Sequence, residues 1–169
     1  YINKQNQIQF PIGFINIGGI SNITKVLDAS GNTEENIEAF DSGPGNCLID
    51  EWIRVNSKKK FDNDGLIAQS GKIDQLILNQ AIDNFEIQSY DKSLDIKNFD
   101  TSFARGLSFE DGCATITNFT AYLIAKGIEY SNNDKSKNIK YLICGGGRKN
   151  NYLINCIKDY LSNETNLSL

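Results

Sequence analysis

The sequence predicts an α/β fold, in which a mixed sheet with antiparallel hairpin strands carries packed helices. Three observations lead to this class: β-favouring segments come first, amphipathic helical segments follow, and a short apolar segment near residue 140 ends in three glycines. Elements in this order bury their apolar faces by packing helices against a sheet. With 169 residues, 40% of them hydrophobic, the chain is long enough for one well-buried domain.

The first part of the chain is predicted to form three consecutive antiparallel strands. Apolar and β-branched residues lead up to Gly18 and Gly19, resume at once, and end again at a polar turn. A Gly-Gly turn suits such a hairpin because glycine accepts the positive φ that tight turns require. The predicted strands are 12–18, 21–28 and 37–42.

A helical period begins after residue 46. In NCLIDEWIRVN, the residues Leu48, Ile49 and Trp52 fall on one helical face. The lysine-rich SKKKF at 57–61 is interpreted as a solvated loop rather than a phosphate patch. Further helices are predicted at 63–70, 73–86, 108–131 and after residue 150, and a strand buried on both faces is predicted at 140–144.

Composition narrows the classes of function. The net charge of -4 and the pI of about 4.9 disfavour general binding to nucleic acid or to an anionic membrane. Without a long apolar run or a signal-peptide pattern, the expected location is cytoplasmic. Histidine is absent, which excludes Ser-His and Cys-His nucleophile pairs. The cysteines form no C-x-x-C motif and are predicted to be small core residues rather than zinc ligands or disulfides: Cys47, Cys113, Cys144 and Cys156.

The segment FDSGPGN at 40–46 is predicted to turn the chain sharply from a strand into a helix. Pro44 and Gly45 match the central positions of a type II turn, and Asn46 is the expected helix N-cap. Asp41 and Ser42 then lie at the same edge. Turn amides and helix N-termini attract anionic or hydroxylic ligands. The alternative is that a strand-to-helix turn needs glycine and proline for structural reasons alone.

Two further glycine clusters follow predicted strands. Gly18 and Gly19 would let backbone amides approach a phosphate, or would only form the hairpin. Gly145, Gly146 and Gly147 stand where a strand meets a helix, the position at which ligands bind in α/β sheets. Neither G-x-G-x-x-G nor G-x-x-x-x-G-K-[ST] occurs. Taken together, the clusters predict a phosphate-and-nucleoside cleft at one edge of the sheet.

The order of these motifs resembles the anhydro-N-acetylmuramic acid kinase family, within the actin-like sugar kinase and Hsp70 ATPase superfamily. The resemblance runs from residue 13 over nearly the whole chain. It implies an RNase H-like (actin-like ATPase) domain that uses ATP and Mg²⁺ to convert 1,6-anhydro-N-acetylmuramic acid to N-acetylmuramic acid 6-phosphate in peptidoglycan recycling. The matching motifs are NIGGISNIT, FDSGPGN-x-LIDEW, KSLD, FEDGCATITNFTA and CGGGRKN.

The resemblance also implies roles for particular residues. Gly18 and Gly19 would lie at the nucleotide phosphates. Gly145, Gly146 and Gly147 would line the adenosine site. Asp41 is expected to orient water bound to Mg²⁺, and no residue is expected to bind the metal directly. The residues expected to face the cleft near the sugar are Asp41, Ser42, Gly43 and Asn46.

Two family motifs are missing from this sequence. They are a Gly-Thr-Ser-x-Asp-Gly phosphate hairpin and a Gly-Gly-x-Gly-Ala-Pro segment that carries the general base, so the catalytic residue is unknown. Residues 1–169 are therefore interpreted as the second, C-terminal domain of a two-domain sugar kinase, truncated at both ends, whose partner is an N-terminal kinase domain. The alternative is a non-catalytic nucleotide- or partner-binding remnant. The sequence does not determine the substrate range or the oligomeric state, for which a homodimer is one alternative.

Overall fold

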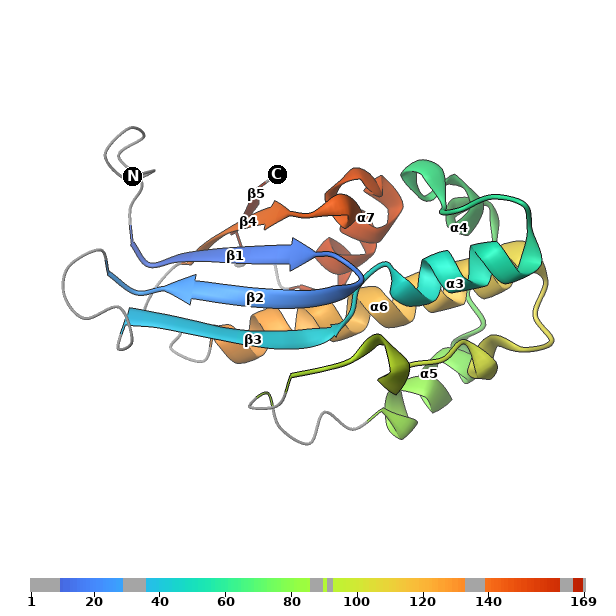
Figure 1. Cartoon of the computed structure of the whole chain (residues 1–169), viewed down its shortest axis with the longest axis horizontal. Helices are drawn as coiled ribbons and strands as arrows, with labels where there is room; N and C mark the ends of the chain where they lie inside the picture. Colours follow the sequence, from blue (N-terminus) through green and yellow to red (C-terminus); the bar gives the residue numbers. More distant parts are fainter. Residues whose placement is uncertain are drawn as a thin grey trace.

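In the computed structural model, residues 10–28, 36–85, 90, 93–132, 139–161 and 166–168 are described. Within these residues, five strands form one mixed sheet with the spatial order β3-β2-β1-β4-β5 (Figure 1). β1 and β2 pair antiparallel, as do β2 and β3, whereas β4 runs parallel to both β1 and β5. The strands are β1 (Ile12–Ile17), β2 (Ile20–Val26), β3 (Ile37–Pro44), β4 (Lys140–Cys144) and β5 (Asn166–Ser168). The predicted antiparallel hairpin strands and the later strand are confirmed.

Helices occur in each predicted helical region. Residues 63–70 do not form one continuous helix, because Asp64 and Gly65 adopt positive φ angles of 59° and 73° and separate a short 3-10 turn from α4. Residue 86 of the predicted 73–86 helix and Lys92 of the KSLD motif lie outside the described residues. The α-helices are α3 (Cys47–Asn56), α4 (Leu66–Ser70), α5 (Gln75–Asn84), α6 (Phe109–Ser131) and α7 (Asn151–Tyr160), and the 3-10 turns are η1 (Asn63–Gly65), η2 (Ile96–Asn98), η3 (Ser102–Ala104) and η4 (Gly146–Lys149).

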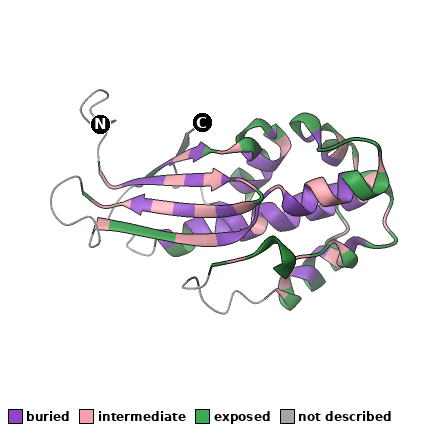
Figure 2. Ribbon diagram, viewed as in Figure 1, coloured by how far each residue is buried: buried purple, intermediate pink, exposed green. Residues whose placement is uncertain are grey.

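The long helix α6 is the centre of the core. It begins with the Ser108 hydroxyl accepting from the Asp111 amide at 3.1 Å, and most of its length is buried (Figure 2). Glycine permits its close approach to the sheet, since a Cβ on Gly127 would lie 2.6 Å from the Cβ of Ser42. Alternate strand residues face this helix and form the core with it, among them Ile15, Ile17, Ile23, Tyr141 and Ile143.

The opposite face of the sheet is less covered. Asn16 pairs in register with Asn22 and Cys144, and Asn22 pairs with Asp41, so these four residues form one polar row across the strands. All four are half-buried or exposed. The prediction that 140–144 is buried on both faces is therefore wrong, since Leu142 is half-buried and Cys144 is exposed.

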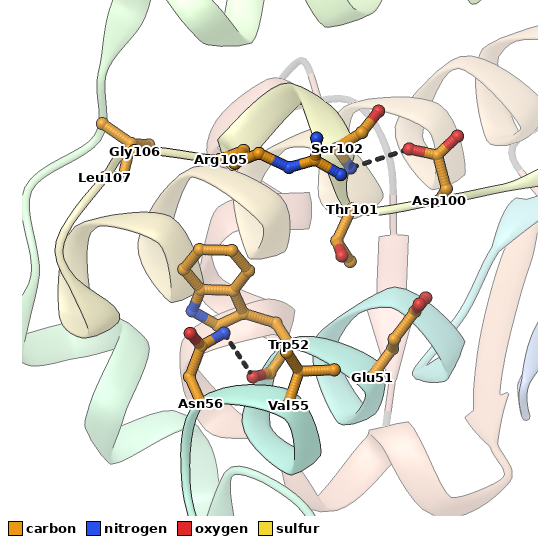
Figure 3. A pocket seen from close by; sticks show the side chains of 10 residues that line it. All are labelled: Glu51, Trp52, Val55, Asn56, Asp100, Thr101, Ser102, Arg105, Gly106 and Leu107. Atoms are coloured by element: carbon orange, nitrogen blue, oxygen red, sulfur yellow. Dashed lines mark hydrogen bonds between the residues drawn. The ribbon is translucent and has the colours of Figure 1, made fainter.

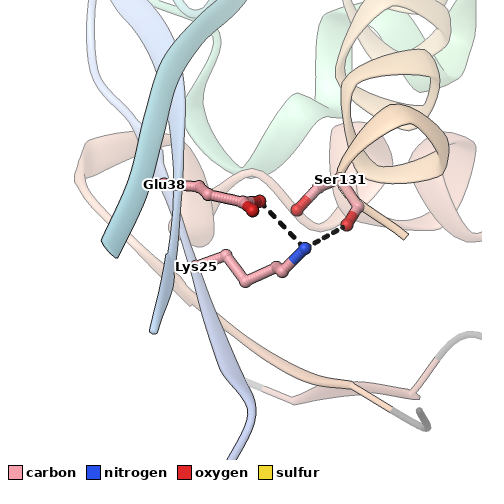
Figure 4. A network of polar contacts seen from close by, with 3 residues as sticks. All are labelled: Lys25, Glu38 and Ser131. Atoms are coloured by element: carbon pink, nitrogen blue, oxygen red, sulfur yellow. Dashed lines mark hydrogen bonds and ion pairs between the residues drawn. The ribbon is translucent and has the colours of Figure 1, made fainter. Parts of the chain in front are cut away.

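A buried lysine ties the end of α6 to the sheet (Figure 4). Lys25 Nζ donates to the carbonyl oxygen of Ser131 at 3.0 Å and forms an ion pair with Glu38 Oε2 at 2.9 Å. The lysine is only 9% exposed, whereas the glutamate is half-exposed. A cation at the C-terminus of a helix also interacts favourably with the helix dipole and with carbonyls that lack a partner within the helix.

We expect Lys25→Met to lower the free energy of unfolding by about 1–3 kcal/mol, because the buried carbonyl of Ser131 loses a charged donor. The matched control is Lys126→Met, which removes the exposed Lys126–Glu129 pair and should cost under about 1 kcal/mol. Urea unfolding of the two variants and the parent measures both changes. Equal losses in the two variants would contradict a special role for Lys25.

Candidate functional site

The β1–β2 turn and the start of α3 are locked together through their backbones. The amides of Gly45 and Cys47 donate to the carbonyl of Gly19 at 2.8 and 3.1 Å, and the amide of Asn46 donates to the carbonyl of Gly18 at 2.7 Å. The Asn46 side chain adds donations from Nδ2 to the carbonyls of Ile17 and Gly18 at 3.3 and 3.2 Å. These three amides are therefore satisfied by the protein, which favours the structural interpretation of this turn over the anion-binding one.

The local conformation of this turn also differs from prediction. Gly18, Gly19 and Gly45 are not among the glycines with positive φ, whereas Gly43 has a φ of 144°. Asn46 occupies the N-cap position, yet its side chain makes no capping hydrogen bond because it donates to the hairpin instead. Glycine is needed at 45 for close approach, since a Cβ there would collide with the carbonyl oxygen of Gly18. The type II turn is therefore replaced by direct packing of two backbones.

The third glycine cluster reaches the same place. Because β4 is parallel to β1, its C-terminal end lies beside the end of β1. Gly147 packs so closely on Ile17 that a Cβ would collide with that side chain. Gly146 is exposed, and a Cβ on it would meet only Asn46 Nδ2, at 3.8 Å. The structure thus brings the hairpin turn, the start of α3 and the late glycine cluster into one site around Asn46.

A cavity of about 400 Å³ opens beside Gly146 and Asn46. Its far wall is the loop Phe61–Asp64, which the sequence reasoning did not single out. The available signal was the turn sequence FDNDG, in which Asp and Gly accept left-handed backbone. Phe61 is an exposed aromatic residue, and Lys149 adds one cation to the lining. Aromatic, amide, glycine and carboxylate groups therefore converge on one space of ligand size.

Carboxylates hold this loop in place. Asp62 is buried and accepts from the amides of Ile67 and Ala68 at 2.9 and 3.0 Å, at the start of α4. Asp64 Oδ1 accepts from the amide of Asn151 at 3.3 Å, at the start of α7. Asp50 also lines the cavity, and burial raises the pKa of its carboxyl. Asp62 and Asp64 thus support the cavity wall. Asp50 is the remaining carboxylate of the lining and the best candidate among the three for binding a ligand.

The residues before the turn separate onto two faces. Ser42 is fully buried, and its hydroxyl lies 2.7 Å from the hydroxyl of Ser21. Gly43 faces Leu123 of α6. Both support the turn from the core, which differs from the cleft position expected for them. Asp41 lies on the opposite face, half-buried, and its Oδ2 accepts from the amide of Leu94 at 2.8 Å.

A second hollow of about 520 Å³ lies at the other end of α3 (Figure 3). It is lined by Trp52 and Val55 of α3 and by a loop that includes Arg105. The indole of Trp52 donates to the carbonyl of Phe109 at 2.8 Å, which fixes the floor. No residue of the glycine clusters lines this hollow, so it is separate from the candidate site.

The described residues contain no group of three or more His, Cys, Asp or Glu side chains placed to hold a metal ion. No helix among them is both long enough and apolar enough to cross a membrane.

The mixed sheet, with three antiparallel strands followed by parallel ones and a helix behind, has the RNase H-like (actin-like ATPase) fold. A solved structure with this fold is the activator of the 2-hydroxyisocaproyl-CoA dehydratase from Clostridium difficile with bound ADPNP. Its TM-score is 0.53 at 14% identity, over 95% of this chain and 54% of that one. At this identity the likeness shows the fold alone.

The family model for anhydro-N-acetylmuramic acid kinase matches residues 4–168, and the chain belongs to this family. The kinase of Pelagibacter ubique is 46% identical over 161 residues, which are 94% of this chain and 42% of that protein. The kinase of Rhodospirillum rubrum is 36% identical over 149 residues, which are 87% of this chain and 38% of that protein. The chain therefore spans about two fifths of the length of these relatives.

The cysteines divide into two groups. Cys47, Cys113 and Cys156 are buried, and burial raises the pKa of each thiol. Cys144, at the end of β4 beside Gly145, is exposed, so its predicted place in the core is wrong. The core prediction is confirmed for the other three.

We expect a thiol reagent to modify Cys144 much faster than the other three cysteines, because the buried thiols are both shielded and harder to ionise. Peptide mass analysis after brief alkylation at neutral pH identifies the modified residue. In Cys144→Ser the fast reaction should disappear. Rapid modification of Cys47 or Cys156 in the native chain would contradict the burial of α3 and α7 against the sheet.

Proposed function

We propose that this chain is the nucleotide-binding domain of a kinase that acts on 1,6-anhydro-N-acetylmuramic acid in peptidoglycan recycling in the cytoplasm. Water opens the 1,6-anhydro bond while ATP phosphorylates O6, giving N-acetylmuramic acid 6-phosphate and ADP. The observation that supports the proposal most strongly is the meeting of three glycine clusters around Asn46, beside a cavity of about 400 Å³. Membership of the kinase family supports the choice of reaction.

The nucleoside is assigned to the cavity beside Gly146. This glycine has open space above it, which a side chain would fill. Phe61 offers an aromatic face for a base, and Asp50 offers carboxylate oxygens to ribose hydroxyls. The phosphates are assigned to the adjoining Gly18–Gly19 turn, which Asn46 connects to the cavity.

The contribution of this chain to the reaction is positioning. Phosphoryl transfer depends on holding the phosphates and the attacking oxygen in line. Bound Mg²⁺ neutralises charge on the phosphates and usually keeps several of its waters. Asp41 is half-buried and has one oxygen on Leu94, so its carboxylate fits a role in accepting hydrogen bonds from such a water.

The remaining parts of the site are assigned to a second domain. The relatives are more than twice as long as the segment that this chain spans. We propose that a domain from that additional length supplies the other phosphate hairpin, the general base and much of the sugar site. The second candidate function is a non-catalytic domain that binds nucleotide or a partner.

We expect Gly146→Val to weaken binding of Mg·ADP by roughly tenfold or more, because the branched side chain enters the cavity. Gly146→Ala should have a smaller effect. Titration calorimetry measures affinity, and thermal unfolding should be unchanged because position 146 has open space and no positive φ. Undiminished affinity in the folded valine variant would show that the nucleoside does not bind here.

We expect residues 1–169 to bind Mg·ATP without turning it over, since loss of a general base alone removes about 10²- to 10⁴-fold in rate. ADP release and sugar phosphate are followed with ATP, Mg²⁺ and the anhydro-sugar. Adding the portion of the Pelagibacter ubique kinase that this chain does not span should restore turnover. Turnover by this chain alone would contradict the two-domain proposal, and binding without turnover in both mixtures would favour the non-catalytic domain.

A further inference from the structure

The segment Ser93–Asn98 lies against the candidate site from the β3 side (Figure 1, olive). Its Leu94 amide donates to Asp41 Oδ2 at 2.8 Å. Two residues later, the side chain of Ile96 reaches the hairpin turn, where a Cβ on Gly19 would lie 3.3 Å from Ile96 Cδ1. Asp41 therefore anchors this segment, and Gly19 lies beneath it; both are predicted site residues.

Internal hydrogen bonds give the segment a defined shape. Asp95 Oδ1 accepts from the Lys97 amide at 3.0 Å, and Asn98 Oδ1 accepts from the Asp95 amide at 2.7 Å, which together form a capping box around η2. Phe99 follows at once and packs on Phe85, with ring centroids 5.3 Å apart. The segment is thus a preformed turn that the Asp41 carboxylate joins to the sheet.

The strand order places this segment opposite the nucleoside cavity. β4 and Gly146 lie on one side of the β1–β2 turn, whereas β3 and Asp41 lie on the other. A nucleotide with its base beside Gly146 and its phosphates along Gly18–Gly19 therefore extends its terminal phosphate toward Asp41 and Ile96. Ile96 is 54% exposed, so an apolar side chain stands at this end with little protein above it.

We propose that Asp41 is a positioning residue that holds Ser93–Asn98 over the Gly18–Gly19 turn, so that this segment forms the wall at the terminal-phosphate end of the site. The proposal rests on the nucleotide site assigned above. A nucleoside triphosphate then contacts the wall, whereas a diphosphate ends before it. The apolar side chain of Ile96 at that end also limits the access of bulk water to the phosphate that is transferred.

Hydrogen exchange of the 169-residue chain tests the anchor without nucleotide. In Asp41→Ala the Leu94 amide should exchange roughly tenfold faster or more, because a charge-assisted hydrogen bond is lost. Asp41→Asn should give a smaller change, since its amide oxygen still accepts. The matched control is Asp100→Asn, where an exposed aspartate accepts from the Ser102 amide at 2.7 Å in the next turn, and Leu94 exchange should not change. Unchanged Leu94 exchange in Asp41→Ala would overturn the proposal.

The same measurement with Mg²⁺ and either ADP or a non-hydrolysable ATP analogue tests the wall. The analogue should slow exchange in residues 93–98 of the parent and of Asp100→Asn, whereas ADP should not. In Asp41→Ala the affinity for the analogue should fall roughly tenfold relative to that for ADP, with partial recovery in Asp41→Asn. If ADP and the analogue have equal effects on exchange in residues 93–98, the wall proposal is wrong, but the proposed nucleotide site is not affected. Failure of the parent to bind either nucleotide would overturn both proposals.

Discussion

The site depends on the backbone contact between the β1–β2 turn and the first residues of α3. Carbonyls of Gly18 and Gly19 accept from three successive amides at 45–47, so a hairpin end and a helix start share their hydrogen bonds. Backbone groups can approach this closely only where side chains are absent, which explains Gly45. This contact sets the direction in which α3 leaves the sheet, and with it the positions of Asn46 and Asp50 at the cavity.

The cavity also depends on the parallel strand β4, which brings the late glycine cluster beside the end of β1. A parallel neighbour of β1 must arrive by a crossover, and the crossover here includes the long buried helix α6. At the end of β4, Gly147 packs against Ile17 and Gly146 is exposed beside Asn46. The loop 61–64 is then held in place from two sides, by Asp62 at α4 and Asp64 at α7. The cavity is therefore assembled from parts that are distant in sequence.

The glycines Gly18, Gly19, Gly45 and Gly147 lie near Asn46, but the conformation predicted for three of them is wrong. Positive φ was predicted for Gly18, Gly19 and Gly45, and none of them has it, whereas Gly45 is required because a Cβ there would collide with the carbonyl oxygen of Gly18. The resemblance to the kinase family implied a cleft position for Ser42, but this residue is fully buried. The β2–β3 pairing has a bulge between Ser21 and Asn22. On one face of the sheet, Ser42 contacts Ser21 in the core, whereas Asp41 lies on the opposite face.

The sequence by itself determined the class of fold, four of the strands, the helical regions and the family, because periodicity and joint motifs are properties of the linear order. Tertiary structure alone decided which face of the sheet is covered, and hence that Cys144 is exposed and Ser42 is not. It also decided that Phe61–Asp64 faces Gly146 and that Leu94 bonds Asp41. These pairings join residues separated by tens of positions, and no local pattern encodes such distances, because they follow from how the helices pack on the sheet.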